Sequence, residues 1–72
     1  MNESELNAKY TVAFVNSLHI DDYGCFMVSE SDAHRLASLN TGKPVAAVKG
    51  NLSIEVESVV DGELIGKKLE VV

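Results

Sequence analysis

Two dipeptides that favour tight turns divide the C-terminal part of the chain into three short apolar segments. The dipeptides are Gly50-Asn51 and Asp61-Gly62, and the segments are residues 44–50, 51–60 and 63–72. A two-residue hairpin turn needs a left-handed backbone at its first central position or at both, and Gly, Asn and Asp adopt this backbone more readily than other residues. The sequence therefore predicts three consecutive antiparallel strands.

The turns also predict a register, and the side-chain pattern agrees with it. The expected pairs are Val45–Val56 and Ala47–Ile54 in the first hairpin, and Ile54–Leu69, Leu52–Val71 and Glu55–Lys68 in the second. One face of the middle strand then has apolar neighbours on both sides, and the other has an opposite-charge pair. A slip by one residue would remove both features, which favours this register.

The N-terminal half predicts two further strands and one helix. Residues 9–16 alternate apolar side chains on both faces, which is typical of a central strand, and residues 25–29 form a second strand that pairs with it as a hairpin. The helix spans residues 29–43, with Ser29 as its N-cap and Gly42 at the left-handed position after its end.

The expected fold class is thus α+β, a small antiparallel sheet with one helix on one face. Its element order is β-β-α-β-β-β. Residues 9–72 form this single domain and residues 1–8 a flexible N-terminal arm. A chain of 72 residues has room for only one small core.

The charge balance excludes some partners and favours others. Eleven acidic residues against six basic ones give a net charge of −5, which argues against direct nucleic-acid binding and allows a basic protein partner. No segment approaches the roughly 20 apolar residues that span a bilayer, so no membrane is expected. The single Cys25 and the polar, acidic start of the chain favour the cytoplasm.

Residues 18–26, LHIDDYGCF, concentrate groups that could carry chemistry. His19, Asp21, Asp22 and Cys25 lie within this stretch, and the remaining histidine is His34 in the predicted helix. The spacing matches no zinc-ligand pattern, and Asp-Asp before Gly is ordinary turn chemistry. A Cys25–His34 nucleophile pair would lack an orienting partner. We therefore expect a solvated turn, with no catalytic residues, metal or cofactor.

The last hairpin carries the candidate partner surface. Val59 and Leu64 pair across the turn, on the face expected to bear Glu55 and Glu57. If the helix covers the other face, this apolar pair is exposed beside acidic groups, an arrangement that often marks a protein contact. The predicted partner-binding residues are Glu55, Glu57, Val59, Asp61, Glu63 and Leu64. The alternatives are a solvated acidic face, or a face packed on the N-terminal hairpin or a second subunit.

Residues 56–66, VESVVDGELIG, resemble a β-hairpin of small phage-borne anti-CRISPR proteins of the type I-F class, which runs roughly V-E-x-V-V-[N/D]-G-x-x-V-G. The helix between the second and third strands departs from that family. The resemblance implies an inhibitor that binds a nucleic-acid-processing host complex, a larger protein or ribonucleoprotein, by surface contact.

The expected function is a non-enzymatic, acidic protein-binding module that inhibits or regulates such a complex. The alternative is a self-associating accessory or structural protein whose homodimer completes the core. The motive for a homodimer is the final strand, 63–72, which would lie at a sheet edge and could pair with a second copy.

Overall fold

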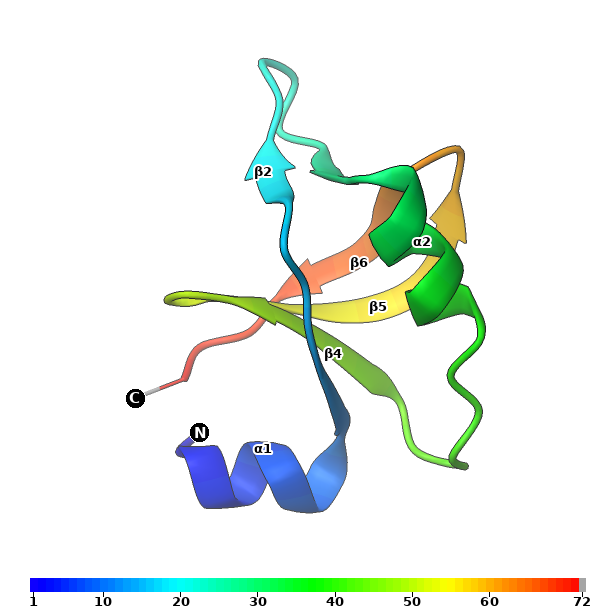
Figure 1. The fold of residues 1–72 in the computed structure, drawn as a ribbon. Helices are drawn as coiled ribbons and strands as arrows, with labels where there is room; N and C mark the ends of the chain where they lie inside the picture. The colour runs from blue at the N-terminus through cyan, green and yellow to red at the C-terminus, as the bar shows by residue number, and fades with distance from the viewer. Residues whose placement is uncertain (72) are drawn as a thin grey trace.

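A curled, mixed sheet and two helices make up the fold (Figure 1). The computed structural model describes residues 1–71. In chain order the elements are α1 (Glu3–Lys9), β1 (Thr11–Phe14), β2 (Leu18–Ile20), β3 (Phe26–Val28), α2 (Glu30–Ala37), β4 (Val45–Lys49), β5 (Leu52–Val60) and β6 (Glu63–Lys68). The strands follow the spatial order β1-β4-β5-β6-β3-β2. The expectation of a small α+β fold is confirmed, whereas the strand arrangement and the number of helices differ from it.

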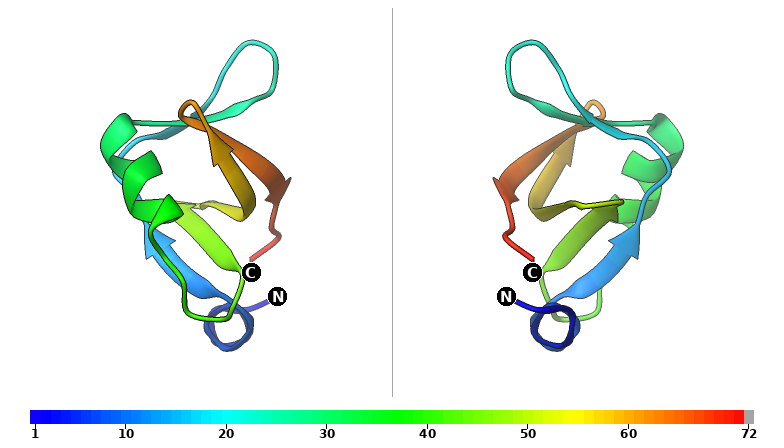
Figure 2. Two further views of the ribbon diagram at one scale, coloured as in Figure 1. Left: turned by 90° about the vertical axis from the view of Figure 1, so that its right-hand side faces the viewer. Right: turned by 90° about the vertical axis from the view of Figure 1, so that its left-hand side faces the viewer.

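The sheet has to curl because its two end strands are neighbours in the chain. β1 and β2 lie at opposite ends of the strand order, yet only residues 15–17 connect them. Six flat strands would span roughly 24 Å, whereas this connection reaches at most about 14 Å. Figure 2 shows the result: the ends of the sheet approach each other and enclose an interior that α2 covers on one side.

The C-terminal meander forms as the turn dipeptides predict. Gly50, Asp61 and Gly62 all have positive φ angles, of 60°, 51° and 81°. The first hairpin has the expected register, with the pairs Val45–Val56 and Ala47–Ile54. Local turn chemistry therefore determines this part of the fold.

The second hairpin departs from the expected register because β5 contains a β-bulge between Val56 and Ser58. Residues of β5 before the bulge pair with β6 one position earlier than expected. Ile54 pairs with Lys68 and not with Leu69, and Glu55 pairs with Lys67 and not with Lys68. The expected Leu52–Val71 pair lies beyond the end of β6. An extra residue in one strand reverses the side-chain alternation. Val56 points to the interior before the bulge and Val59 after it.

Gly66 makes the bulge sterically possible. It pairs with Val56, and a Cβ atom at this position would lie 1.7 Å from the carbonyl oxygen of Glu55. No side chain fits at that distance. The close approach of the two backbones at the bulge therefore requires glycine.

The N-terminal strands do not form the expected hairpin. The segment 9–16 breaks after Phe14, and β1 pairs in parallel with β4. The hairpin partner of β3 is β2, within the stretch expected to be a loop. The sheet is therefore mixed and not purely antiparallel. β1 lies at one end of the strand order instead of the centre, and its two apolar faces are explained by packing on both sides.

The final strand is also not a sheet edge. β6 ends at Lys68 and lies between β5 and β3, with which it pairs antiparallel. Val72, the last residue of the predicted strand 63–72, lies outside the described residues. The structural motive for pairing with a second copy through this strand is therefore wrong.

The flexible arm expected at residues 1–8 is also corrected, because this segment forms most of α1. Asn2 caps the helix, its side chain accepting a hydrogen bond from the Glu5 N–H at 2.9 Å. Leu6 is buried against Ala46, Val48 and Leu69. Such a short helix is marginal alone, so this docking stabilises it.

Two apolar clusters result, one on each face of the sheet. The main core lies inside the curl and includes Val15, Leu18, Val28, Leu36, Ala47, Ile54 and Leu64. The smaller cluster lies outside the curl under α1, and consists of Leu6, Ala46, Val48 and Leu69 with partly buried neighbours. α1 thus covers the outer face only over the β1–β4 side.

α2 begins where the sequence predicts and ends earlier. The Ser29 hydroxyl accepts from the Asp32 N–H, as expected of an N-cap, and Leu36 enters the main core. The helix ends at Ala37, so Gly42, with a φ of 82°, lies in the following loop and does not terminate it.

Asp32 holds α2 against the bend between β1 and β2. Its Oδ2 accepts hydrogen bonds from the Asn16 N–H (3.1 Å), from the Ser17 N–H (3.0 Å) and hydroxyl (3.1 Å), and from the Ser29 hydroxyl (3.2 Å). Arg35 donates to the other carboxylate oxygen, Oδ1, at 3.1 Å. Burial acts to raise the pKa of Asp32, but the hydrogen bonds from Ser17, Asn16 and Ser29 outweigh it and lower the pKa.

Candidate partner-binding face

The predicted apolar pair is not on the outer surface. Val59 and Leu64 pair across the turn as expected. Leu64, however, is only 2 % exposed and belongs to the main core, and Val59 packs against that core. The bulge in β5 is the reason, because it turns Val59 to the face opposite Glu55. Leu64 is therefore a structural residue and cannot contact a partner in the folded protein.

Glu55 is engaged within the molecule. The Tyr10 hydroxyl donates to its carboxylate at 2.6 Å, and the Lys67 Nζ lies 3.9 Å from its Oε2. The hydrogen bond to Glu55, together with desolvation, raises the pKa of Tyr10. These three side chains form a polar boundary on the outer face, next to the part that α1 covers.

The other predicted acidic residues are accessible. Glu57 is exposed at the bulge and Asp61 in the turn. Glu63 is half-buried on the outer face, paired with Val60 on one side and Met27 on the other. The structure therefore keeps three of the six predicted residues accessible as acids around the last turn.

Beyond the polar boundary, neither α1 nor α2 covers the outer face of β2, β3, β6 and the end of β5. We name this surface the bare face; it consists of His19, Met27, Ser58, Val60, Glu63 and Ile65. Val60 is 53 % exposed and Ile65 40 % exposed. The exposed apolar pair at the last hairpin is therefore Val60 and Ile65, each one position after the predicted residue.

One sequence signal could have located this face. Gly66 stands inside a strand pattern, and an isolated glycine there indicates a bulge. A bulge opposite Gly66 reverses the alternation in β5, which turns Val59 inward and Val60 outward. Met27 and His19 join the face only through the β3–β6 pairing, for which the sequence has no local signal.

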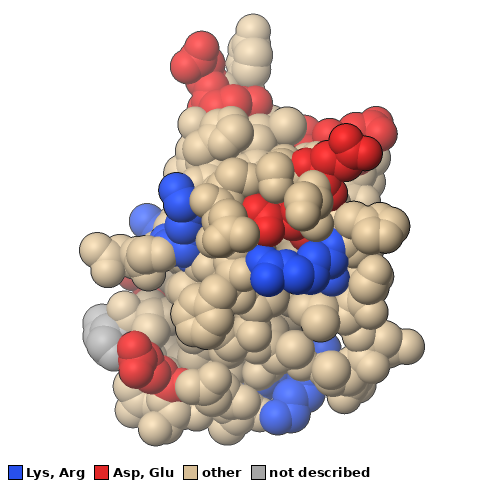
Figure 3. All heavy atoms as spheres, viewed as in Figure 1, with Lys and Arg blue, Asp and Glu red and all other residues tan. Residues whose placement is uncertain are grey.

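Acidic groups lie at one end of the bare face. Asp21 and Glu63 both lie near Cys25, at the start of β3. Figure 3 shows acidic side chains at the top of the molecule, over the β2–β3 hairpin tip and toward the start of α2, and further acidic atoms low on the left; Lys and Arg side chains lie below the upper acidic group in that view. The charge distribution would attract a basic partner toward this end of the molecule.

The residues 18–26 that suggested chemistry form a hairpin turn. The Asp21 side chain accepts hydrogen bonds from the Tyr23 and Cys25 N–H groups at 2.9 and 2.8 Å, a typical Asx turn. Burial, with the charges of Asp21 and Glu63, raises the pKa of the Cys25 thiol, which opposes nucleophilic chemistry. Within residues 1–71, no three His, Cys, Asp or Glu side chains are placed to hold a metal ion.

In the part of the chain that the structure describes, neither helix is long and apolar enough to cross a membrane. Comparisons with protein-family models, curated proteins and solved structures find no match to this chain.

Proposed function

We propose that the chain is a non-enzymatic protein-binding module that inhibits or regulates a larger, basic partner, and that the bare face is its contact surface. The supporting observation is an apolar patch without cover, formed by Val60 and Ile65 beside Glu63 and Asp61. Apolar patches with a polar rim are typical of protein contacts. The net charge of −5 suits a basic partner such as a nucleic-acid-processing complex.

Further observations support this class of function. The raised pKa of the Cys25 thiol opposes nucleophilic catalysis, and His34 is exposed on α2. The acidic surface opposes direct nucleic-acid binding. The unpaired Cys25 suits a reducing compartment, and we therefore assign the protein to the cytoplasm. The resemblance of residues 56–66 to type I-F anti-CRISPR proteins points to the same function and stays a prediction.

The test is affinity capture from the native host's lysate with three forms of the protein, followed by mass spectrometry. A bare-face variant carries Val60→Lys and Ile65→Lys. A control variant adds the same two charges at exposed helix positions, as Ala8→Lys and Ala37→Lys. Circular dichroism confirms that all forms are folded. We expect the parent and the control to retain one basic protein that the bare-face variant loses.

Binding kinetics then test the mechanism. Acidic groups at an interface rim should make association faster at low salt, whereas the apolar pair should slow dissociation. Equal capture of the partner by the folded bare-face variant contradicts the proposal. A parent that captures nothing, but forms a dimer in light scattering that the bare-face variant dissolves, would support the self-association alternative instead.

A further inference from the structure

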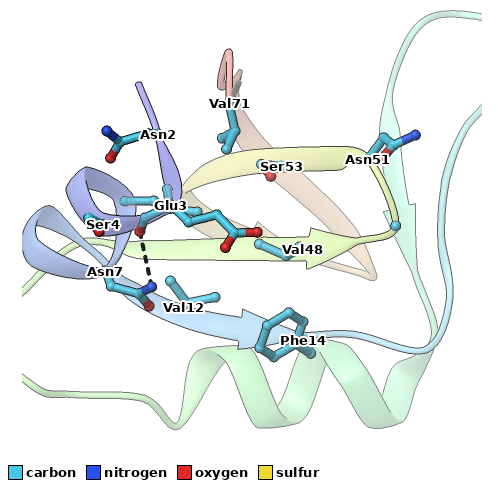
Figure 4. A pocket seen from close by; sticks show the side chains of 12 residues that line it. Asn2, Glu3, Ser4, Asn7, Val12, Phe14, Val48, Asn51, Ser53 and Val71 are labelled. Atoms are coloured by element: carbon cyan, nitrogen blue, oxygen red, sulfur yellow. Dashed lines mark hydrogen bonds between the residues drawn. The ribbon is translucent and has the colours of Figure 1, made fainter.

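A groove lies on the opposite part of the outer face, between α1 and strands β1, β4 and β5 (Figure 4). Its volume is about 770 Å³, within the range of small-ligand sites. The floor is apolar and includes Val12 and Val48, and Phe14 stands at the rim with 71 % of its surface exposed. A single exposed aromatic ring beside an apolar floor offers contact to a chain-like ligand.

Ser53 places an unpartnered hydroxyl in this groove. The residue is only 4 % exposed, yet it lines the groove, and Figure 4 shows its oxygen on the side of Val48. No side-chain hydrogen bond among residues 1–71 uses this hydroxyl. The described residues hold no buried side-chain oxygen or nitrogen without a hydrogen-bond partner. The Ser53 oxygen is therefore open to the groove, and it is free to bond a polar group that enters.

Two more residues that line the groove have side-chain oxygen atoms that can accept hydrogen bonds. Figure 4 shows the Glu3 side chain extending from α1 over Val48, and within the described residues its carboxylate forms no ion pair. The Asn7 side chain donates its amide to the Glu3 carbonyl oxygen at 3.0 Å, which leaves its own oxygen as an acceptor. Glu3 is the sole charged residue among those that line the groove.

These features select one ligand chemistry. Carboxylate, amide oxygen and hydroxyl can all accept, so the complementary group is one that only donates and is positively charged. A primary ammonium has three donors and no acceptor. A lysine adds an aliphatic stem that can lie on the apolar floor, while the ammonium gains attraction from the aromatic face of Phe14. An anion would be repelled by Glu3.

The geometry points to a lysine-binding groove: Glu3 and Ser53 receive the ammonium of a lysine side chain carried by a basic segment of the partner protein. Lysine suits the site better than arginine, because its three rotatable donors can bond acceptors that come from separate elements, whereas a planar guanidinium is best matched to the Glu3 carboxylate alone. This inference rests on the proposed function only in its choice of a protein as the carrier of the lysine.

The probe is Nα-acetyl-lysine N-methylamide, with the norleucine analogue as the matched ligand without an ammonium. Titration of ¹⁵N-labelled protein should shift the amide signals of Val12, Val48 and Ser53, and leave those of Met27 and Ile65 in place. Glu3→Gln should weaken binding by up to about fivefold, the usual scale for an exposed ion pair. Ser53→Ala should also weaken it.

Glu5→Gln serves as the control, since it removes the same charge from the same helix turn at a residue outside the groove lining. Equal binding of the norleucine analogue, tighter binding of the arginine derivative, or unchanged binding by folded Glu3→Gln would each overturn the inference. Absence of lysine binding would also overturn it. None of these results bears on the bare face, which the two lysine substitutions at Val60 and Ile65 test separately.

Discussion

Replacing Asp32 should destabilise the protein more than replacing any other acidic residue. Its carboxylate is buried and accepts five hydrogen bonds, two of them from the N–H groups of Asn16 and Ser17. Asp32→Ala leaves those two amides without a partner, and each unpaired amide lowers the free energy of unfolding by about 1–3 kcal/mol. The ion-pair partner, Arg35, has half of its side chain exposed, so the loss of the pair itself adds only about 0–1 kcal/mol. We therefore expect the free energy of unfolding to fall by about 2–6 kcal/mol, mainly through the two amides.

That loss is a large share of the whole stability, because the free energy of unfolding of a domain is only roughly 0.05–0.15 kcal/mol per residue. Urea unfolding monitored by circular dichroism at pH 7 measures the effect. Asp32→Asn, which keeps one acceptor oxygen and removes the charge, should lose less than Asp32→Ala. Asp22→Asn is the matched control, since Asp22 is exposed in the β2–β3 turn, and it should unfold like the parent.

The pH dependence gives a second test with a defined sign. The folded state lowers the pKa of Asp32, so its contribution is fully present above the unfolded value of about 3.9 and is lost as the pH falls through the folded value. The stability difference between the parent and Asp32→Asn should therefore shrink below about pH 4. An unchanged urea midpoint for Asp32→Ala, or a difference that persists in acid, would refute the role assigned to this carboxylate.

Three further predictions follow from the β5–β6 hairpin and its neighbour. Gly66→Ala should prevent native folding, because the new methyl group would overlap the Glu55 carbonyl oxygen; soluble expression and thermal melting check this. Leu64→Ala should lower the free energy of unfolding by about 2–5 kcal/mol, and Ile65→Ala should lower it by well under half of that. Equal melting temperatures of the two variants would show that Leu64 and Ile65 are assigned to the wrong faces of the sheet. The Cys25 thiol should react with iodoacetamide more slowly at pH 8 than free cysteine, because its pKa is raised.

The parts of the fold that the sequence could predict depend on local chemistry. The turns at Gly50-Asn51 and Asp61-Gly62 and the Ser29 cap act through residues next to each other in the chain. The parallel pairing of β1 with β4 joins segments far apart, and β1 has no motif that selects a parallel neighbour over an antiparallel one. α1 forms because Leu6 docks on the sheet, which a polar segment with one leucine does not reveal.

The candidate site illustrates how a small local feature changes a functional prediction. The hairpin forms at the predicted place, and Val59 pairs with Leu64 as expected. Glu57 is an extra residue at the bulge, so the β5 side chains that follow it point to the opposite face of the sheet from the one expected. The accessible apolar residues are therefore Val60 and Ile65. Strand alternation is reliable only as far as the next bulge, and the glycine that permits the bulge lies on the other strand.

The connection from β1 to β2 also determines how the chain can assemble. Strands β4, β5 and β6 each pair with a neighbour in sequence, so their loops close at little entropic cost. β1 instead needs β4, and the β2–β3 hairpin needs β6, and both partners follow after long stretches of chain. During synthesis, the first strand therefore emerges well before its partner exists. Assembly that begins with the meander and ends with residues 15–17 drawn across the open sheet would make the Asp32 contacts among the last to form.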